Sequence, residues 1–374
     1  MRILLDYRPA LRARTGVGEY LHQLARHLAA GKFGDSLTLF TSSWKDRPDP
    51  SLRRDCPGVR VSDHRIPVRL LNLAWHNLEW PPVELLGTGD QDVVCSAHPL
   101  LTPTRRAAQV VTIHDIDFLN HPERTQAEIR RDYPRLVGNH ARRADRIIVS
   151  SHHTAAELGR TLGIEKERIR VCPPGAPQWH DAPRACTPES GYLLFMGTLE
   201  PRKNVGLLLA AYGRLLSRRP DMPKLVLAGG ATPEARPWID AIAQPPLAGH
   251  VEHIGYVSEL DRQRVYGGAR VLVLPSWNEG FGITALEAMS LGIPVVASDR
   301  GALPEVVGDA GLLMSPDSED SLVSALDQLL SNGWLADALS ARGRERATRF
   351  NWQSTAALVR AAFEEAAHVR AHRN

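Results

Sequence analysis

The stretch from Val271 to Leu291 constrains the fold more than any other part of the chain. The apolar run 271–274 is typical of a buried strand, and 283–291 is typical of a helix. Between them lies a glycine-containing loop that carries Glu279, and Glu287 follows one to two turns into the predicted helix. Strand–loop–helix units of this kind build open α/β sheets, whose ligands bind at the carboxyl ends of the strands.

The loop and the helix start predict a seat for phosphate between two carboxylates. The first N–H groups of a helix have no partner within the helix, and they carry the positive end of its dipole. A carboxylate accepts hydrogen bonds from hydroxyl groups. Glu279 and Glu287 on either side of such a seat suit a ligand with both hydroxyls and phosphate, such as a nucleotide sugar.

The bulk properties narrow the class of protein. The 374 residues favour two domains, and 43% hydrophobic with 23% charged residues is ordinary for a globular chain. Neither a signal peptide nor an apolar run of membrane-spanning length is evident, and a net charge of +3 is too small to indicate nucleic acid. Scattered cysteines without CxxC spacing argue against a zinc site or disulfides and lead us to expect a reducing cytoplasm: Cys56, Cys95, Cys172 and Cys186.

Strand and helix patterns alternate along both halves. Strands are predicted at 3–7, 110–113, 146–150, 169–172, 192–196, 224–228, 251–254, 271–274, 293–297 and 311–314. Such alternation gives parallel sheets with helices on both faces. We therefore expect an α/β protein of two doubly wound, Rossmann-like domains that face each other across a cleft. Residues 1–175 would form the first domain, the Pro-, Ala- and Gly-rich 176–190 a linker, and 191–349 the second domain.

Two motifs of the second half carry a family resemblance. Residues 195–204 read FMGTLEPRKN, and Glu279 precedes Glu287 in the loop–helix unit. The segments 288–298, 303–307 and 311–313 continue the match, and TGVG at 15–18 and IHD at 113–115 extend it more loosely into the first half. These segments together resemble the retaining glycosyltransferases of family 4, which have the GT-B fold.

The resemblance implies an activity and a layout. A hexose would pass from a nucleotide sugar to a hydroxyl acceptor with retention at the anomeric carbon, in polysaccharide or glycolipid assembly. The second domain would hold the nucleotide, and a C-terminal helix within 350–374 would cross back onto the first. The segment 197–204 is similar to that of bacterial mannosyltransferases and favours GDP-mannose, while UDP-glucose and related donors stay open. No metal or other cofactor is expected, because helix dipoles and basic residues neutralise the leaving diphosphate in this fold.

The same resemblance assigns roles in the second half. Lys203 and Arg202 would bind the donor diphosphate, Glu287 the ribose hydroxyls, and Glu279 the sugar near the reacting centre. Many family members carry arginine directly after the glycine, where this chain has Thr198, and Arg202 is the candidate to supply that charge. Backbone groups of Phe281, Gly282 and Ile283 would face the sugar or phosphate. The base would meet Gly255, Tyr256 and Val257.

In the first half the resemblance assigns His114 to the donor sugar, against the alternative of a structural histidine. Gly16 and Gly18 precede a predicted helix and would approach the diphosphate or the acceptor, or else form a plain strand-to-helix turn. No third glycine stands at the spacing of a nicotinamide site. Two Asp-x-Asp patterns resemble metal sites of other glycosyltransferases and are interpreted as not binding metal: Asp115 with Asp117, and Asp90 with Asp92.

Several further features leave alternatives open. A basic segment would contact an anionic membrane or a lipid-phosphate acceptor at the inner membrane face, or be a solvated helix: Arg130, Arg131, Arg135, Arg142, Arg143 and Arg146. Arg8, Arg12 and Arg14 would contact a phosphorylated acceptor. The aromatic group Trp75, His76 and Trp80 would either form a platform for the acceptor sugar or pack in the core. The rival functions are a GT-B phosphorylase, a sugar synthase with a soluble acceptor, and a nucleotide-sugar-binding protein without catalysis.

Overall fold

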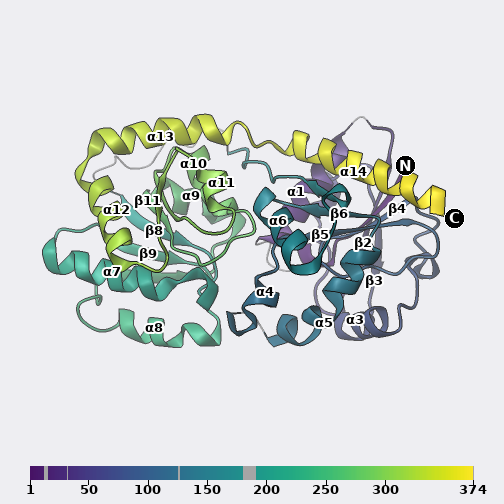
Figure 1. Cartoon of the computed structure of the whole chain (residues 1–374), viewed down its shortest axis with the longest axis horizontal. Helices are drawn as coiled ribbons and strands as arrows, with labels where there is room; N and C mark the ends of the chain where they lie inside the picture. Colours follow the sequence, from purple (N-terminus) through teal and green to yellow (C-terminus); the bar gives the residue numbers. More distant parts are fainter. Residues whose placement is uncertain (12–15, 32, 125–126, 180–190, 374) are drawn as a thin grey trace. The chain divides into compact units, whose positions relative to one another are not determined.

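A computed structural model describes residues 1–11, 16–31, 33–124, 127–179 and 191–373 (Figure 1). The chain divides into two compact units, Met1–Gly175 with Asn351–Asn374, and Ala176–Phe350. Of the segment predicted as a linker, residues 176–179 belong to the second unit, and 180–190 lie outside the described residues.

The first unit is built on a parallel sheet in the order β3-β2-β1-β4-β5-β6-β7. Its strands are β1 Arg2–Asp6, β2 Ser36–Ser42, β3 Arg60–His64, β4 Val93–Ser96, β5 Ala108–Ile113, β6 Arg146–Val149 and β7 Ile169–Val171. Successive side chains of a strand point to opposite faces. Leu5 accordingly joins one apolar core and Leu4 another, so both faces of the sheet must be covered by helices.

The helices of the first unit provide that cover. They are η1 Arg8–Ala10, α1 Val17–Ala30, α2 Leu52–Asp55, α3 Val68–Asn77, η2 Val83–Leu86, α4 Asp117–Asn120, η3 Pro122–Arg124, α5 Ala127–Arg143, α6 His152–Leu162, η4 Lys166–Arg168 and α14 Trp352–Arg373. The C-terminal α14 packs beside α1, and its Val359 and Phe363 share a core with Leu5. Ser151 caps α6 by accepting a hydrogen bond from the Thr154 N–H.

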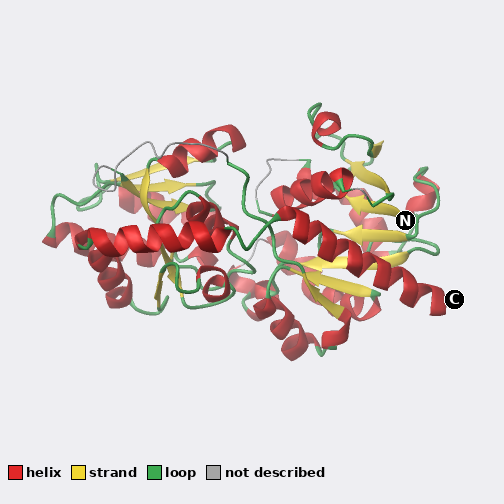
Figure 2. Cartoon of the chain, turned by 90° about the horizontal axis from the view of Figure 1, so that it is seen from above, coloured by secondary structure: helices red, strands yellow, loops and turns green. Residues whose placement is uncertain are grey.

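The second unit has a parallel sheet in the order β10-β9-β8-β11-β12-β13. Its elements are β8 Tyr192–Met196, η5 Pro201–Lys203, α7 Val205–Arg218, β9 Leu225–Ala228, η6 Pro233–Ala235, α8 Arg236–Ile242, β10 Val251–Gly255, α9 Glu259–Gly267, β11 Ala269–Leu274, α10 Ile283–Ser290, β12 Val295–Ser298, α11 Leu303–Val307, β13 Leu312–Met314, α12 Glu319–Ser331 and α13 Gly333–Ala347. Phe195 packs in the core that includes α7 and α12, and Leu194 in the core that includes α9 and α10. Figure 2 shows strands between helices in each unit.

Both sheets reverse their strand order next to their first strand. In the first unit the chain moves from β1 to β2 and β3 on one side, then starts again with β4 on the other. In the second unit the same reversal separates β8 from β11. The loops after these two strands leave the sheet in opposite directions, which opens a crevice at their carboxyl ends, the usual ligand site of such sheets. The fold expectation of two doubly wound α/β units is confirmed.

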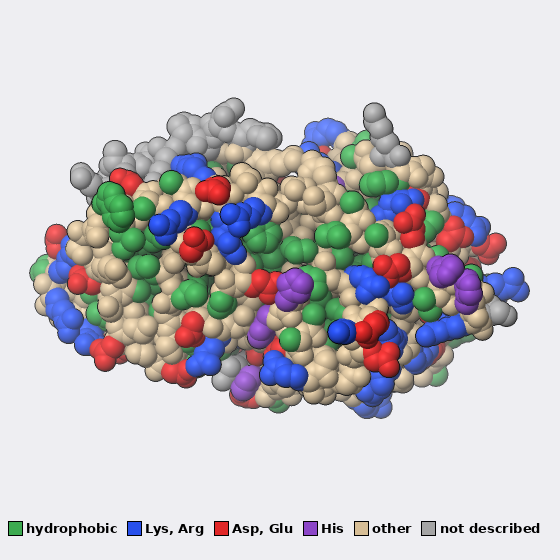
Figure 3. Space-filling view, turned by 45° about the horizontal axis from the view of Figure 1, so that its top comes forward, with side chains coloured by type: hydrophobic (Ala, Val, Ile, Leu, Met, Phe, Trp, Pro, Cys, Tyr) green, Lys and Arg blue, Asp and Glu red, His purple; other side chains and the backbone are tan. Residues whose placement is uncertain are grey.

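Two surface properties complete the description. No helix within the described ranges is long and apolar enough to cross a membrane. On the face drawn in Figure 3, basic and acidic side chains are interspersed, in keeping with the small net charge of +3.

Candidate active site

The loop after β8 is fixed to the loop after β11 by hydrogen bonds of its backbone and of Arg202. The Trp277 N–H donates to the Arg202 carbonyl at 2.9 Å. The Arg202 guanidinium donates to the Asn278 carbonyl at 2.8 Å and to the Glu200 carboxylate at 2.9 Å. These bonds bring the two loops that flank the strand-order reversal together and position Lys203 between them.

Glu279 is the centre of this arrangement. It is only 7% exposed, and its Oε1 accepts from Lys203 Nζ at 2.7 Å and from Ser276 Oγ at 2.7 Å. Arg202 Nη1 lies 3.4 Å from Oε2. Burial alone would raise the pKa of this carboxyl, but the charges of Lys203 and Arg202 and the hydrogen bonds outweigh it and hold the pKa at about 2. Glu279 is therefore ionised at neutral pH.

Two glycines allow close packing around the loop that carries Glu279. A Cβ on Gly301, whose φ is +64°, would lie 2.6 Å from the Glu279 nitrogen, and the adjacent Ala302 N–H donates to the Glu279 carbonyl at 2.9 Å. Gly282, the N-cap of α10, has a φ of 105°, and a Cβ there would meet Leu303 at 2.7 Å. Within the described residues no side chain caps α10, so its first N–H groups are free to meet a ligand. Phe281 is buried against Phe350, and Ile283 is the first residue of the helix.

Glu287 lies one turn into α10 and is 3% exposed. Its Oε2 accepts from the Tyr266 hydroxyl at 2.7 Å and lies 3.0 Å from the Arg262 guanidinium. Burial raises the pKa of Glu287, and these two partners only partly offset it; burial likewise raises the pKa of Tyr266 well above its usual range. Sequence reasoning missed Arg262 and Tyr266, which come from α9 and belong to none of the motifs.

The triplet predicted to meet the base begins with Gly255, the last residue of β10. The Gly255 carbonyl accepts from the Gly229 N–H at 2.7 Å, which joins this loop to the one after β9. The Tyr256 ring is 49% exposed, whereas Val257 packs against a core cluster. Only Tyr256 of the three offers an open side chain to a ligand.

In the first unit, His114 directly follows β5. Its ring meets Tyr20 edge-on at 4.9 Å, and its Nε2 is buried without a hydrogen-bond partner among the described residues. Burial lowers the pKa of His114 to about 4, so the imidazole is neutral at pH 7. Its carbonyl accepts from Thr154 Oγ1 at 3.1 Å.

The glycine loop predicted to approach the diphosphate or the acceptor is only partly described. Gly16 is the N-cap of α1, and Gly18 lies in its first turn close to Pro9. The rest of the glycine loop, with Arg12, Arg14 and Thr15, lies outside the described residues.

A buried charge cluster missed by the sequence argument occupies the crevice beside β1. Asp6 is fully buried and pairs with Arg8 at 2.6 Å and with His98 at 3.1 Å. Burial would raise the pKa of Asp6, but Arg8 and His98 hold it well below its usual range. Arg8 also donates to Asn72 at 2.8 Å and lies 4.5 Å from the centre of the Trp75 ring. Arg8 is thus held by protein groups, and its expected contact with a phosphorylated acceptor stays a prediction. Trp75 is a core residue, while Trp80 is exposed.

The structure also places the two Asp-x-Asp patterns and part of the basic segment. Asp115 Oδ1 accepts from the Asp117 N–H, and Asp92 pairs with Arg2. No group of three metal-ligating side chains is found in the described part of the chain. The side chains of Arg130 and Arg131 lie outside the described residues. The others of the basic segment lie in or just after α5: Arg135, Arg142, Arg143 and Arg146.

Two parallel sheets, each with its crevice beside the first strand, are the architecture of the GT-B fold. Family models match both units: Glycosyltransferase Family 4 over residues 14–177 and Glycosyl transferases group 1 over residues 183–346. The chain belongs to the family-4-like glycosyltransferases of the GT-B fold.

The chain is similar to curated and solved members of this group over nearly its whole length. The O-antigen chain mannosyltransferase B of Escherichia coli is 29% identical over 374 residues, covering 95% of this chain and 97% of that protein. The D-inositol 3-phosphate glycosyltransferase of Mycobacterium marinum is 29% identical, covering 94% and 81% respectively. Sucrose-phosphate synthase from Thermosynechococcus elongatus shares the fold with a TM-score of 0.80 at 23% identity, covering 97% of this chain and 98% of that one.

Proposed function

We propose that the protein transfers mannose from GDP-mannose to a hydroxyl of a growing saccharide, with retention at the anomeric carbon. The observation that carries the proposal is the Lys203–Glu279 pair at 2.7 Å, beside the uncapped start of α10. A cation, an ionised carboxylate and free N–H groups then meet at one crevice, and they match a diphosphate joined to a hydroxylated sugar. The similarity to an O-antigen chain mannosyltransferase supports the choice of mannose.

Donor binding would exchange the partners of Lys203. Its ammonium donates to the Glu279 carboxylate at 2.7 Å. A diphosphate at the start of α10 would compete for Lys203 and Arg202, and each charge-assisted contact contributes about 1.5–3 kcal/mol. Glu279, no longer paired with Lys203, would then accept from the sugar hydroxyls, and Glu287 would accept from the ribose hydroxyls. Tyr256 and the backbone of Gly255 would meet the base, and the N–H groups of Gly282 and Ile283 would meet the phosphate.

The chemical step uses groups of both substrates. The acceptor hydroxyl oxygen attacks the anomeric carbon on the face from which the diphosphate leaves. The bond from that carbon to the phosphate oxygen breaks, and this oxygen takes the hydroxyl proton. Glu279, ionised because its pKa is about 2, stabilises the positive charge that develops on the sugar and does not donate a proton. His114, neutral at pH 7, is proposed as a contact of the donor sugar.

The proposal includes independence of metal. Lys203, Arg202 and the positive end of α10 would neutralise the leaving diphosphate, which is the task that a divalent cation performs in other transferases. Asp115 and Asp117 are then left without a catalytic role.

A donor screen tests the proposal. The purified protein is mixed with GDP-mannose, UDP-glucose, UDP-N-acetylglucosamine or a dTDP-sugar in the presence of EDTA, and released nucleoside diphosphate is measured. Release of GDP from GDP-mannose alone is the expected result. Release from another donor would reject mannose but keep the enzyme class, whereas release that requires added Mg²⁺ or Mn²⁺ would reject metal independence.

Two controls separate the rival functions. Nucleotide binding without release from any donor, even with mixed saccharide acceptors, would favour the non-catalytic interpretation. Phosphate-dependent release of a sugar phosphate from an oligosaccharide would indicate a phosphorylase.

A further inference from the structure

A buried arginine stands behind the carboxylate that the proposed function assigns to the ribose. Arg262 comes from α9, and its guanidinium lies 3.0 Å from Oε2 of Glu287 on α10. Only 14% of the Arg262 side chain and 4% of the Glu287 side chain are exposed. Tyr266, one turn further along α9, donates to the same Oε2 at 2.7 Å. Two side chains of α9 therefore hold one oxygen of this carboxylate, and neither of these contacts uses Oε1.

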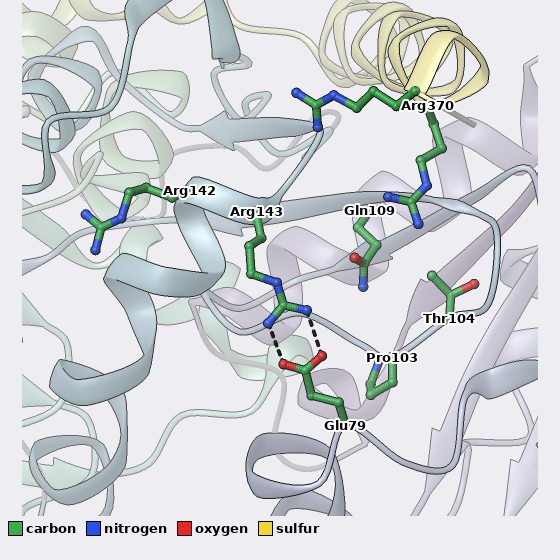
Figure 4. Close-up of a pocket in the computed structure, with 8 residues that line it drawn as sticks. Glu79, Pro103, Thr104, Gln109, Arg142, Arg143 and Arg370 are labelled. Atoms are coloured by element: carbon green, nitrogen blue, oxygen red, sulfur yellow. Dashed lines mark hydrogen bonds and ion pairs between the residues drawn. The ribbon is translucent and has the colours of Figure 1, made fainter.

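An arginine–glutamate pair of the first unit gives the comparison. Glu79 binds Arg143 through both of its carboxylate oxygens, as the dashed lines in Figure 4 show. Both side chains are exposed, beside a cavity of about 430 Å³ that Arg370 and Arg373 also line. The hydrogen bonds from Arg143 lower the pKa of Glu79. The protein thus satisfies both oxygens of this carboxylate, and such an exposed pair contributes little free energy.

Burial gives Glu287 the opposite shift. It raises the pKa of this carboxyl, and the charge of Arg262 opposes the rise. Within the described residues, the charged and titratable groups that act on Glu287 are Arg262 and Tyr266, both from α9; β11, β12, α11 and α13, which also pack against α10, add none. In the described part of the chain, Arg262 is therefore the one positive charge that favours the ionised form of Glu287.

A gain in stability does not account for this pair. Replacing a buried ion pair with apolar side chains of similar volume is often neutral or even stabilising. Val265 on α9 and Ala288 on α10, the sequence neighbours of Tyr266 and Glu287, belong to one apolar core. An ionised carboxylate at such a place, with Oε1 outside both contacts, is what a ligand with hydroxyl donors requires.

The place of Glu287 along α10 fits a ribose. Ile283 begins the helix at the end proposed to meet the phosphate, and Glu287 follows it by about 6 Å along the helix axis. The ribose follows the phosphates in the same order in a nucleotide. An ionised carboxylate only accepts hydrogen bonds, and it serves two adjacent hydroxyls, whereas a protonated carboxyl gives up part of this acceptor capacity.

We propose that Arg262 is a positioning residue that makes the site select ribonucleotides over 2′-deoxyribonucleotides. It keeps Glu287 ionised, so that the carboxylate accepts from both ribose hydroxyls. A nucleotide without the 2′-hydroxyl leaves a buried, charged acceptor short of a donor, which weakens binding. The inference rests on the proposed function, because it takes the nucleotide to bind beside Glu287, but it holds for any ribonucleoside diphosphate. Sugars carried on dTDP are then poor donors.

Calorimetric titration of the full chain with four nucleotides tests the selection. GDP is compared with 2′-deoxy-GDP, and UDP with 2′-deoxy-UDP, so that the test does not depend on the base. At pH 7 the unchanged chain should bind the ribonucleotide about 10-fold or more tightly than its deoxy form. Arg262→Met should lower this ratio of affinities at least about fivefold. Arg262→Lys keeps a positive charge and should keep most of the ratio.

The pH dependence separates a lost charge from damaged packing. In Arg262→Met, Glu287 should take up a proton at a higher pH, since a fully buried carboxyl reaches a pKa of about 8–9. The ratio of this variant should therefore recover as the pH rises from about 6 to about 9, while that of the unchanged chain changes little. Both nucleotides of a pair share the titration of base and phosphates, so the ratio cancels it.

Matched controls come from the same two helices. Arg264 of α9 is 80% exposed and pairs with Asp261, so Arg264→Met should leave the ratio unchanged. Glu287→Gln should lower the ratio as Arg262→Met does. Combining the two should lower it no further, because both act on the same carboxylate. The double variant leaves no unpaired buried charge, and its urea unfolding should show that it is folded.

Three outcomes would overturn the inference. The same ratio in Arg262→Met and the unchanged chain would remove the role of Arg262. A low ratio in Arg262→Met at every pH would make the effect one of packing. A further loss when Arg262→Met is added to Glu287→Gln would mean that Arg262 contacts the nucleotide itself.

Failure of the proposed function would look different. Binding of UDP but not of GDP would reject GDP-mannose as the donor, and the UDP pair would then carry the same test of Arg262. Binding of none of the four nucleotides would reject the nucleotide site and the inference with it.

Discussion

The two crevices use buried charge in different ways. Beside β1, Asp6 pairs with Arg8 and lies 3.1 Å from the His98 ring, and Arg8 is further held by Asn72 and by the ring of Trp75. Every charge there is matched by protein groups. Beside β8, the glutamate partner of Lys203 comes from a neighbouring loop, at the start of a helix that has no side-chain cap in the described part of the unit.

The difference teaches that a strand-order reversal creates a crevice but not a binding site. The first crevice is occupied by the protein's own ion pairs, which fix the loops around it. The second combines cations that can exchange partners with free N–H groups, and it is the one suited to an arriving anion. The predictions below test whether the first cluster acts in stability and the second in catalysis.

The largest expected effect is that of Asp6→Ala. Removing this carboxylate leaves Arg8 buried without its main partner, and breaking such a pair costs about 3–5 kcal/mol. Urea unfolding should show this loss in the first unit. Nucleotide binding to the second unit should be unchanged. If Asp6→Ala instead lowered nucleotide affinity strongly and left the unfolding free energy unchanged, the nucleotide would bind beside β1 and not beside β8.

Protonation of Glu279 gives the next largest effect. Its pKa is about 2 in the folded state and 4.5 in the unfolded chain, so the folded state holds the proton less tightly. The stabilisation, about 3 kcal/mol, is complete above pH 4.5 and is lost as the pH falls towards 2. The difference in unfolding free energy between the unchanged chain and Glu279→Gln should shrink over this range. A constant difference would mean that the carboxylate is not held by Lys203 and Arg202.

Glu279→Gln should also lower turnover, on the order of 10²-fold, because a neutral amide stabilises little positive charge on the sugar. Nucleotide affinity should be largely kept, since Lys203 and Arg202 remain. The measurements are kcat for donor turnover and calorimetric titration with nucleoside diphosphate. Equal losses in both would contradict the role of Glu279 at the sugar.

Lys203→Met keeps an unbranched side chain that is one atom shorter and removes its charge. One charge-assisted contact to phosphate is worth about 1.5–3 kcal/mol, so donor affinity should fall about 10- to 150-fold. Arg214→Met is a suitable control, because Arg214 lies on α7 and pairs with surface acids instead. Weakening by the control to the same extent would point to a non-specific electrostatic effect.

Tyr266→Phe should have the smallest effect. It removes one hydrogen bond to Glu287, worth about 0.5–1.5 kcal/mol, and leaves Arg262 in place. Nucleotide affinity should fall by about tenfold or less, with kcat unchanged. A change in kcat alone would show that Glu287 acts on the sugar rather than on the ribose.

Local patterns in the sequence were enough to predict much of the second unit. Strands β8 and β11 are buried apolar runs, and the predicted ranges 192–196 and 271–274 agree with them closely. The loops after them carry Lys203 and Glu279, so their meeting follows from parallel strand order. The edge strand β3, with the polar sequence RVSDH, lacks the apolar pattern and was not predicted.

Contacts between distant loops were beyond such patterns. Asp6, Arg8 and His98 meet only because β1 and β4 are neighbours, and that pairing was not predicted from the sequence. Arg262 and Tyr266 reach Glu287 from a helix whose polar and apolar positions carry no motif. The sequence also does not predict how deeply each aromatic side chain is buried. Trp75 is in the core and Trp80 is exposed, although the two tryptophans are close together in the chain.

The position of α14 has a consequence for the order in which the protein is assembled during synthesis. The second unit is one continuous stretch, Ala176–Phe350, whereas the first needs the residues of α14 to complete its core. A nascent first unit therefore exposes the apolar surface that later receives Phe363 for roughly ten seconds or more at ordinary rates of translation. The unit that is translated first is therefore completed last, and until then the part of its core that α14 covers stays exposed.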